Sequence, residues 1–282
     1  MIRRVGVVGC GLMGSGIVET VAKSGYDVVV HELTPGLLTR GLGRIDASMQ
    51  RAVERKKLDA ASRDAARGRI HGTTSLSDLA DVDLAIEVVI ERMDDKKKVL
   101  AELDRLTRPD VVLASNTSSL SITEMAAATG RSDRVIGMHF MNPVPVMPVV
   151  EIVRGLATSD ETLQTARAFA DSLNKKVVVA KDSPGFIVNR LLVPYLLDAV
   201  RVYEQGLATK EDIDAAVTLS LNHPMGPLTL LDFVGLDTTY YIAEAMYQET
   251  KDPRWAPPVM LKQMVTAGWW GRKSGRGFYQ YE

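Results

Sequence analysis

The sequence predicts an α/β domain built on a doubly wound, mainly parallel sheet, followed by an all-helical domain. Three observations carry this prediction. In the first half of the chain, short β-branched runs alternate with longer amphipathic stretches, which is typical of βαβ units. These runs are almost continuously apolar, as expected of strands covered by helices on both faces. Beyond residue 182 the strand pattern ends and helical periodicity replaces it.

The strands of the parallel part of the sheet are expected at Arg4–Val8, Asp27–His31, Leu84–Val88, Val111–Ala114 and Val135–His139. Two further strands, which look like antiparallel additions to the sheet, are expected at Val149–Val153 and Lys176–Ala180. The helices between these strands are expected at Leu12–Lys23, Leu37–Arg55, Asp94–Leu106 and Glu161–Leu173.

The domain boundary is expected near residue 182, because Asp182-Ser183-Pro184-Gly185 has the composition of a turn and a helix cap. We therefore predict an α/β domain over residues 1–182 and a helical domain over residues 183–282. The helices of the second domain are expected at Phe186–Gln205, Lys210–Leu221, Leu228–Val234, Thr238–Thr250 and Pro257–Thr266.

The composition argues against several classes of protein. Lys and Arg (34) balance Asp and Glu (35), so the chain lacks the cationic surplus of nucleic-acid and polybasic membrane binders. No apolar run approaches the ~20 residues that span a bilayer, so no membrane partner is expected. The single cysteine, Cys10, allows neither an internal disulfide nor a cysteine-based zinc site. We expect no metal, and a reducing, cytoplasmic location.

A glycine-rich loop follows the first strand. Gly9-Cys10-Gly11-Leu12-Met13-Gly14 matches G-x-G-x-x-G, in which the glycines permit a tight turn, close approach of a pyrophosphate and close packing of helix on strand. Glu32 closes the second strand, where a carboxylate can accept a hydrogen bond from a ribose 2′-hydroxyl. The alternative for Glu32 is a solvated carboxylate at a strand end. The combination predicts a Rossmann-type domain that binds NAD.

A dehydrogenase that oxidises an alcohol needs a group to accept the hydroxyl proton as the hydride leaves. Histidine is the side chain best suited to this near neutral pH. His139 ends a predicted strand, at the edge where α/β sheets place their ligands. Glu151 is an isolated acid in an apolar strand and needs a partner, for which His139 is the economical choice. The residues alone leave a structural and a catalytic role for this pair equally open. The other three histidines lack such a setting: His31 beside Glu32, His71 before a short polar strand, and His223 in a turn between helices.

Taken together, these residues resemble the L-3-hydroxyacyl-CoA dehydrogenase family, and most closely its short stand-alone 3-hydroxybutyryl-CoA dehydrogenases. The resemblance covers essentially the whole chain. Beyond the glycine loop and Glu151, it rests on the segments Leu84–Lys97, Ser115–Leu120, His139–Pro143, Asp182–Arg190, His223–Pro227, Asp232–Asp237 and Gly271–Phe278.

The resemblance implies oxidation of a 3-hydroxyacyl-CoA to the 3-ketoacyl-CoA with NAD, and the reverse reduction. It implies that His139 is the general acid/base and that Glu151 orients it. Ser118 and Asn189 would position the acyl group and the imidazole. The cofactor contacts it implies are Gly9, Gly11, Leu12, Met13, Gly14, Glu32, Glu91, Lys96, Ser118, Asn142 and Lys273.

Several of these residues have simpler explanations. Lys96 lies in a run of three lysines that could be a solvated helix face, and Lys273 could be an ordinary surface lysine. Ser118 and Asn189 could be helix caps.

Coenzyme A carries several phosphate charges, so a basic element is expected near its site. The resemblance implies Ser48, Arg55 and Lys56 as coenzyme A contacts, within the basic segment Arg51–Arg69. The alternative is a solvated helical face. The family more often has lysine where Arg55 falls and aspartate where Glu32 falls.

The apolar stretches Phe186–Val200 and Leu228–Leu236 exceed what one helical domain needs for its own core, and related enzymes pair through this part, so we expect a homodimer. Two other functions compete with this interpretation. One is a dehydrogenase of similar fold acting on a sugar acid such as L-gulonate. The other is a non-catalytic, crystallin-like structural protein that retains cofactor binding.

Overall fold

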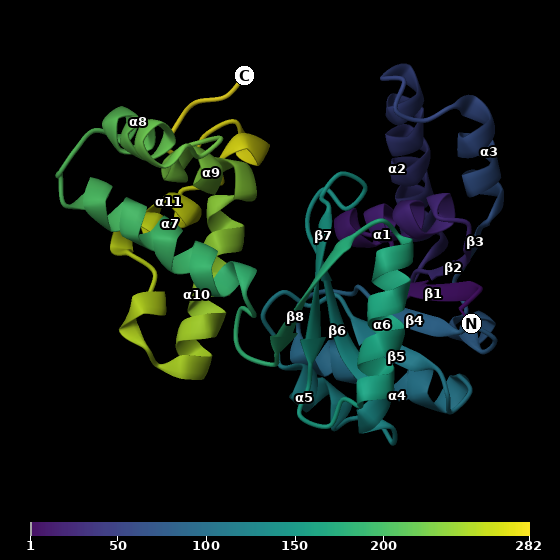
Figure 1. The fold of residues 1–282 in the computed structure, drawn as a ribbon. Helices are drawn as coiled ribbons and strands as arrows, with labels where there is room; N and C mark the ends of the chain where they lie inside the picture. Colours follow the sequence, from purple (N-terminus) through teal and green to yellow (C-terminus); the bar gives the residue numbers. More distant parts are fainter. Residues whose placement is uncertain (1) are drawn as a thin grey trace. The chain divides into compact units, whose positions relative to one another are not determined.

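A computed structural model describes residues 2–282. The chain forms two compact units, Met1–Ser183 and Pro184–Glu282, which are described separately below (Figure 1). The segment between them differs in one respect from expectation. Asp182 accepts hydrogen bonds from the backbone N–H groups of Ile122 and Thr123, so it caps a helix of the first unit rather than the helix that follows it.

The first unit contains an eight-stranded sheet with the order β3-β2-β1-β4-β5-β6-β7-β8. Strands β1 to β6 run parallel to one another, which confirms the predicted doubly wound sheet. Their bounds are Arg4–Val8 (β1), Asp27–His31 (β2), Ile70–Thr73 (β3), Leu84–Glu87 (β4), Val112–Ser115 (β5) and Val135–Phe140 (β6).

The last two strands run in the opposite direction. β7 (Val149–Arg154) pairs antiparallel with β6, and β8 (Lys176–Lys181) pairs parallel with β7. Both strands are thus antiparallel to β1–β6, as expected, because the short connection after β6 returns the chain beside the strand it has just left.

Strand β3, with the sequence Ile-His-Gly-Thr, is the short polar strand that the sequence places just after His71, and it begins earlier than expected, at Ile70. His71 lies inside β3 rather than before a strand. β3 is the edge strand next to β2, and an edge strand can expose side chains that a central strand buries.

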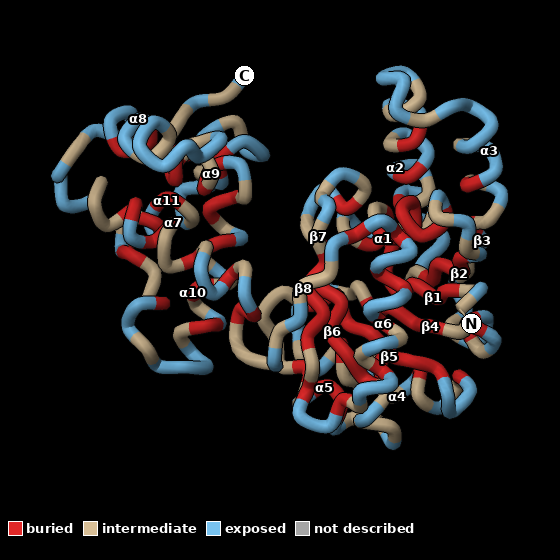
Figure 2. Tube along the Cα trace, viewed as in Figure 1, coloured by how far each residue is buried: buried red, intermediate tan, exposed pale blue. Residues whose placement is uncertain are grey.

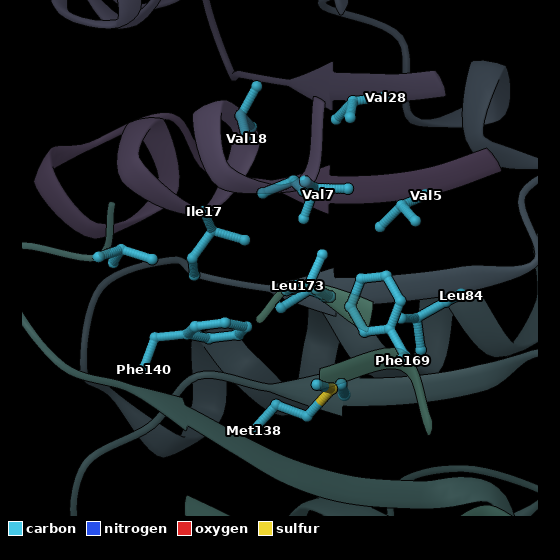
Figure 3. Close-up of a cluster of buried hydrophobic side chains, with 14 of the residues drawn as sticks. Val5, Val7, Ile17, Val18, Val28, Leu84, Met138, Phe140, Phe169 and Leu173 are labelled. Carbon is cyan, nitrogen blue, oxygen red and sulfur yellow. The ribbon is translucent and has the colours of Figure 1, made fainter. Parts of the chain in front are cut away.

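Helices cover both faces of the sheet. α1 (Leu12–Lys23) and α6 (Asp160–Ser172) lie on one face, and their apolar side chains join those of the strands in one core cluster. Figure 3 shows side chains of both helices beside Val5 and Val7 of β1. The other face carries η1 (Leu76–Leu79), α4 (Met93–Leu106) and α5 (Ile122–Ala126). Gly6 and Gly137 permit this packing, because a Cβ on either would lie 3.0 Å or less from Leu79 or Ile122.

The basic segment Arg51–Arg69 is divided between two antiparallel helices. α2 (Pro35–Glu54) is followed by its C-cap residue Arg55, and α3 (Ala60–Gly68) begins after Asp59, whose carboxylate accepts from the N–H of Ser62 at 2.8 Å. The two helices are largely exposed, in contrast to the buried central strands (Figure 2). The turn between them carries Lys56 at φ +57°, a left-handed conformation.

The second unit is helical, as predicted. Its elements are α7 (Val188–Glu204), α8 (Lys210–Leu221), α9 (Pro227–Val234), α10 (Leu236–Thr250), η3 (Pro253–Trp255), α11 (Val259–Thr266) and η4 (Arg272–Ser274). They share a core that includes Leu196, Leu231 and Trp255. Two buried carboxylates fix its polar connections: Asp214 caps α9 through the N–H of Leu228, and Asp232 accepts from the N–H groups of Phe278 and Tyr279. Over residues 2–282, no helix is both long and apolar enough to cross a membrane.

Candidate active site

The glycine loop has the geometry that a dinucleotide phosphate requires. Gly9 has φ +104°, and a Cβ there would lie 2.6 Å from the carbonyl oxygen of Val88. A Cβ on Gly14 would lie 2.0 Å from the carbonyl oxygen of Gly9, so only glycine lets α1 pack this close to β1. A Cβ on Gly11 would meet nothing within 4 Å, which leaves open space at the N-terminus of α1. Leu12 and Met13 form the first turn of α1, where unpaired N–H groups attract an anion.

Glu32 is fixed beside this loop. One carboxylate oxygen accepts from the N–H of Cys10 at 2.6 Å, and the other accepts from the N–H of Leu33 at 3.2 Å. The carboxylate therefore lies at the end of β2, next to the loop, where the ribose of a bound dinucleotide would be. The residues of the loop and Glu32 fit NAD, because they combine an open phosphate cradle with a hydroxyl acceptor.

The thiol of Cys10 is buried under the same loop. Burial, with a further contribution from the nearby charge of Glu32, raises the pKa of Cys10 to about 12. The thiol contacts α2, since a Cβ on Gly41 would lie 2.4 Å from Sγ. Arg44 of the same helix donates to the carbonyl oxygen of Cys10 at 3.3 Å.

His139 and Glu151 face each other across the antiparallel strands β6 and β7. Nδ1 of His139 lies 2.6 Å from Oε2 of Glu151, and both side chains are buried. Asn116, at the end of β5, accepts from the N–H of Phe140 at 2.9 Å and so ties the end of β6 to its neighbour. This places the imidazole at the carboxyl edge of the parallel strands, with one nitrogen engaged by a carboxylate.

The other three histidines are placed differently. His31 is buried at the end of β2, where burial lowers its pKa despite the charge of Glu32. His71 lies on the edge strand β3, and His223 follows α8, with its ring 6.1 Å from that of Tyr195.

Glu91, Lys96 and Ser118 form one connected group above β4 and β5. Lys96 is 1% exposed and its Nζ lies 3.1 Å from Oε2 of Glu91, so it is not part of a solvated helix face. Oε1 of Glu91 accepts from the N–H of Ser118 at 2.9 Å and from the hydroxyl of Thr117 at 2.5 Å. Burial opposes ionisation of Glu91, but the charge of Lys96 and these hydrogen bonds hold its pKa below the usual value.

Glu87 completes this group and was not among the predicted site residues. Its carboxylate is fully buried at the end of β4 and lies 2.9 Å from Nζ of Lys96. It also accepts from the hydroxyl of Ser115 at 2.6 Å and from the N–H of Val89 at 2.6 Å. The sequence carries a signal for it, because Glu87 is an isolated acid in an apolar strand, just as Glu151 is.

The sequence left a helix-cap role open for Ser118 and Asn189, and neither residue is the N-cap of its neighbouring helix. Ser118 lies in the loop before α5, whose N-cap is Ser121, so Ser118 is not a helix cap. Asn189 is buried in the first turn of α7, whose N-cap is Ile187. Asn142 is exposed just beyond β6.

In the second unit, Lys273 is a partly exposed lysine that forms an ion pair with Asp237 at 2.6 Å.

The predicted coenzyme A contacts lie on the α2–α3 pair. Ser48 is half-buried on α2, whereas Arg55 and Lys56 are exposed in the turn between the helices. Arg63 and Arg67 form ion pairs with Asp64 and Asp46. Among residues 2–282, no ion pair involves Arg55 or Lys56, so their charges are available to a ligand.

No group of three or more His, Cys, Asp or Glu side chains is arranged to hold a metal ion within the described part of the chain.

Comparisons with known proteins place the chain in a family. Residues 4–183 match the model of the 3-hydroxyacyl-CoA dehydrogenase NAD binding domain, and residues 185–281 match that of the 3-hydroxyacyl-CoA dehydrogenase C-terminal domain. The chain is 52% identical to a 3-hydroxybutyryl-CoA dehydrogenase of Mycobacterium tuberculosis, with 99% of each chain covered. It is 40% identical to the human mitochondrial hydroxyacyl-coenzyme A dehydrogenase, covering 100% of this chain and 92% of that protein.

A solved structure gives the same result. The (S)-3-hydroxybutyryl-CoA dehydrogenase of Ralstonia eutropha superposes with a TM-score of 0.96 at 45% identity, with both chains fully covered. The matches extend over both units, and they agree with the glycine loop and Glu32 in requiring a dinucleotide cofactor. The chain therefore belongs to the family of NAD-dependent 3-hydroxyacyl-CoA dehydrogenases.

Proposed function

We propose that this enzyme oxidises (3S)-3-hydroxybutyryl-CoA to the 3-ketoacyl-CoA with NAD, and catalyses the reverse reduction. The observation that carries the proposal is the buried pair of His139 and Glu151 at the carboxyl edge of the parallel strands. Two relatives whose names specify this substrate cover the chain almost completely, which supports the short acyl chain.

His139 is the general acid/base of the proposed reaction. NAD, when bound, accepts the hydride from C3 of the substrate. Because Nδ1 of His139 is engaged by Glu151, the hydroxyl proton passes to Nε2. The imidazole becomes a cation in a buried place, which burial alone disfavours, and the carboxylate of Glu151 offsets this cost. In the reduction, the same nitrogen returns the proton to the carbonyl oxygen.

Ser118 and Asn189 complete the proposed catalytic set on the basis of the family resemblance. The N–H of Ser118 is fixed by Glu91, so its side chain starts from a defined position. The proposed cofactor contacts are the glycine loop, Glu32, the connected group of Glu91, Lys96 and Ser118, and, from the family resemblance alone, Asn142 and Lys273.

Coenzyme A is proposed to contact the α2–α3 pair. Arg55 and Lys56 offer exposed positive charge at the turn between the helices, and Ser48 lies on α2 of the same pair. Phosphates are recognised by such groups through charge-assisted hydrogen bonds.

The enzyme is proposed to be a homodimer through its helical unit. Large apolar side chains are exposed there, among them Leu191, Leu219 and Tyr241. Several such side chains on one small unit are typical of a surface that pairs with another chain.

A spectrophotometric assay of NADH oxidation with acetoacetyl-CoA tests the proposal directly. Turnover with acetoacetyl-CoA, and none with free acetoacetate, is the expected result. If L-gulonate is oxidised with NAD and the thioester is not turned over, the sugar-acid dehydrogenase is favoured. Binding of NADH without turnover of either substrate would favour a non-catalytic protein.

A further inference from the structure

The connected group of Glu87, Lys96 and Glu91 contains two carboxylates and one ammonium; Glu87 and Lys96 are buried, and the side chain of Glu91 is 40% exposed. Nζ of Lys96 lies 2.9 Å from Glu87 and 3.1 Å from Glu91. Glu87 is engaged by three donors, one of them an ammonium, which is the environment of an ionised carboxylate. Glu91 is in a similar environment, since it lies 3.1 Å from the same ammonium and accepts from the hydroxyl of Thr117 and the N–H of Ser118; these contacts lower its pKa. The group therefore carries one uncompensated negative charge.

The position of this group along the sheet relates it to one half of the cofactor. The strand order changes direction between β1 and β4, and a dinucleotide crosses such a sheet at that point. Glu32 ends β2, on one side of the glycine loop, and would bind the adenosine ribose. The nicotinamide half must then lie on the other side, above the ends of β4 and β5, where Glu87, Glu91 and Ser118 are found.

The two redox forms of the cofactor differ in charge at this place. The nicotinamide ring is a cation in NAD⁺ and neutral in NADH. A fixed negative charge nearby stabilises the oxidised form more than the reduced form, and a partly buried charge is screened less by solvent than a fully exposed one.

We propose that Glu87 is a positioning residue that sets the charge of the cofactor site: by neutralising Lys96, it leaves the charge of Glu91 to favour NAD⁺ over NADH. Without Glu87, Lys96 would cancel Glu91 and the site would be neutral. Glu87 acts through Lys96 and Glu91, because it is fully buried beneath them. The inference rests on the proposed function only in taking Glu91 as a neighbour of the nicotinamide.

A series of charge variants tests this role. Glu87→Gln removes one negative charge and leaves the group neutral. Glu87→Gln combined with Lys96→Met removes one charge of each sign and keeps the net value of −1. Lys96→Met alone lowers the net charge to −2. The measurement is the ratio of the dissociation constants of NADH and NAD⁺, from fluorescence titration for NADH and calorimetry for NAD⁺, with no substrate present.

The ratio is expected to follow the net charge rather than the number of lost contacts. Glu87→Gln should lower the ratio of the NADH to the NAD⁺ dissociation constant on the order of three- to tenfold, because NAD⁺ loses its electrostatic advantage. The double variant should return it to the wild-type value within about twofold, even where both forms bind more weakly. Lys96→Met should raise the ratio, because the more negative site favours NAD⁺. The matched control is Glu124→Gln. It breaks the exposed ion pair between Glu124 of α5 and Lys97, the neighbour of Lys96 on α4, and it should leave the ratio unchanged.

Loss of one member of a buried ion pair can destabilise a protein, so each variant is first checked by thermal unfolding. If Glu87→Gln does not fold, the double variant, in which the pair is replaced by uncharged groups, and Glu91→Gln carry the test. The double variant must then keep the wild-type ratio and Glu91→Gln must shift it toward NADH. A ratio that is equal in all folded variants, or that falls as far in the double variant as in the single one, would overturn the inference. Failure of the wild type to bind either form would instead contradict the proposed function.

Discussion

His139 and Glu151 occupy directly opposed positions on the antiparallel strands β6 and β7, with Nδ1 2.6 Å from Oε2. Opposed residues on neighbouring strands point to the same face, so the pairing of the strands alone brings the two side chains together. A slip of one residue in this register would turn Glu151 to the other face of the sheet. The contact between His139 and Glu151 therefore depends on the register of β6 and β7, which the buried apolar side chains of the two strands fix.

The first prediction concerns the charge of Glu151. Glu151→Gln preserves the shape of the side chain but removes the charge that stabilises the imidazolium, so kcat for oxidation should fall. Protonation of His139 becomes harder, and the acidic limb of kcat against pH should move to lower pH. His139→Ala should cost about 10²–10⁴-fold in kcat with NAD affinity largely intact. An unmoved limb in a folded, NAD-binding Glu151→Gln enzyme would mean that Glu151 is structural.

The second prediction concerns the turn between α2 and α3. Replacing Arg55 and Lys56 with alanine should raise KM for the acyl-CoA more than it lowers kcat, because the phosphates are held similarly in the ground and transition states. The double variant Lys98→Ala/Arg105→Ala removes the same charge from the exposed face of α4 and serves as the control. If KM is unchanged and NAD binds more weakly instead, this turn has been assigned to the wrong ligand.

The third prediction concerns the choice of cofactor. Glu32 is held beside the glycine loop by the N–H of Cys10, so it would repel a 2′-phosphate and accept from a 2′-hydroxyl. The enzyme should have a much higher kcat/KM with NAD than with NADP, and Glu32→Gln should narrow the difference. Glu54→Gln, an exposed substitution at the end of α2, should not. Comparable kcat/KM values for the two cofactors in the wild type would refute this.

The fourth prediction concerns Cys10. Because burial raises the pKa of this thiol to about 12, it stays protonated at neutral pH and is a poor nucleophile. A maleimide should modify the native protein far more slowly than the urea-unfolded protein. Since Cys10 is the single cysteine, mass spectrometry counts the modification without ambiguity. Rapid modification of the folded enzyme would show that the loop opens and exposes the thiol.

The fifth prediction concerns assembly. The exposed apolar side chains of the helical unit should be covered by a second copy, so light scattering should give about twice the chain mass of 30.8 kDa at micromolar concentration. Leu219→Glu and Tyr241→Glu, substitutions at exposed positions, should shift the enzyme toward the monomer if these side chains lie in the contact. A wild-type enzyme that is monomeric under these conditions would exclude the dimer.

The sequence by itself determined the parts of this protein that depend on local patterns. Apolar runs with short connections specified the parallel strands, and the helical period specified the second unit. The glycine loop was recognisable by its spacing, which reflects local steric requirements: at Gly9 and Gly14 a Cβ would collide with the neighbouring backbone, and at Gly11 the space stays open for a ligand. The buried acid Glu151 was recognisable by the same kind of argument, since an isolated carboxylate in an apolar strand needs a partner.

Only the tertiary structure decided what depends on segments that are distant in the sequence. Which strands β7 and β8 pair with follows from how the chain returns after β6. The burial of Lys96 could not be predicted, because its neighbours Lys97 and Lys98 have the same chemistry and only the helix orientation turns Lys96 inward between Glu87 and Glu91. Charge in a sequence is local, whereas the sign and strength of a charge cluster depend on which side chains the fold brings together and how far it removes them from water.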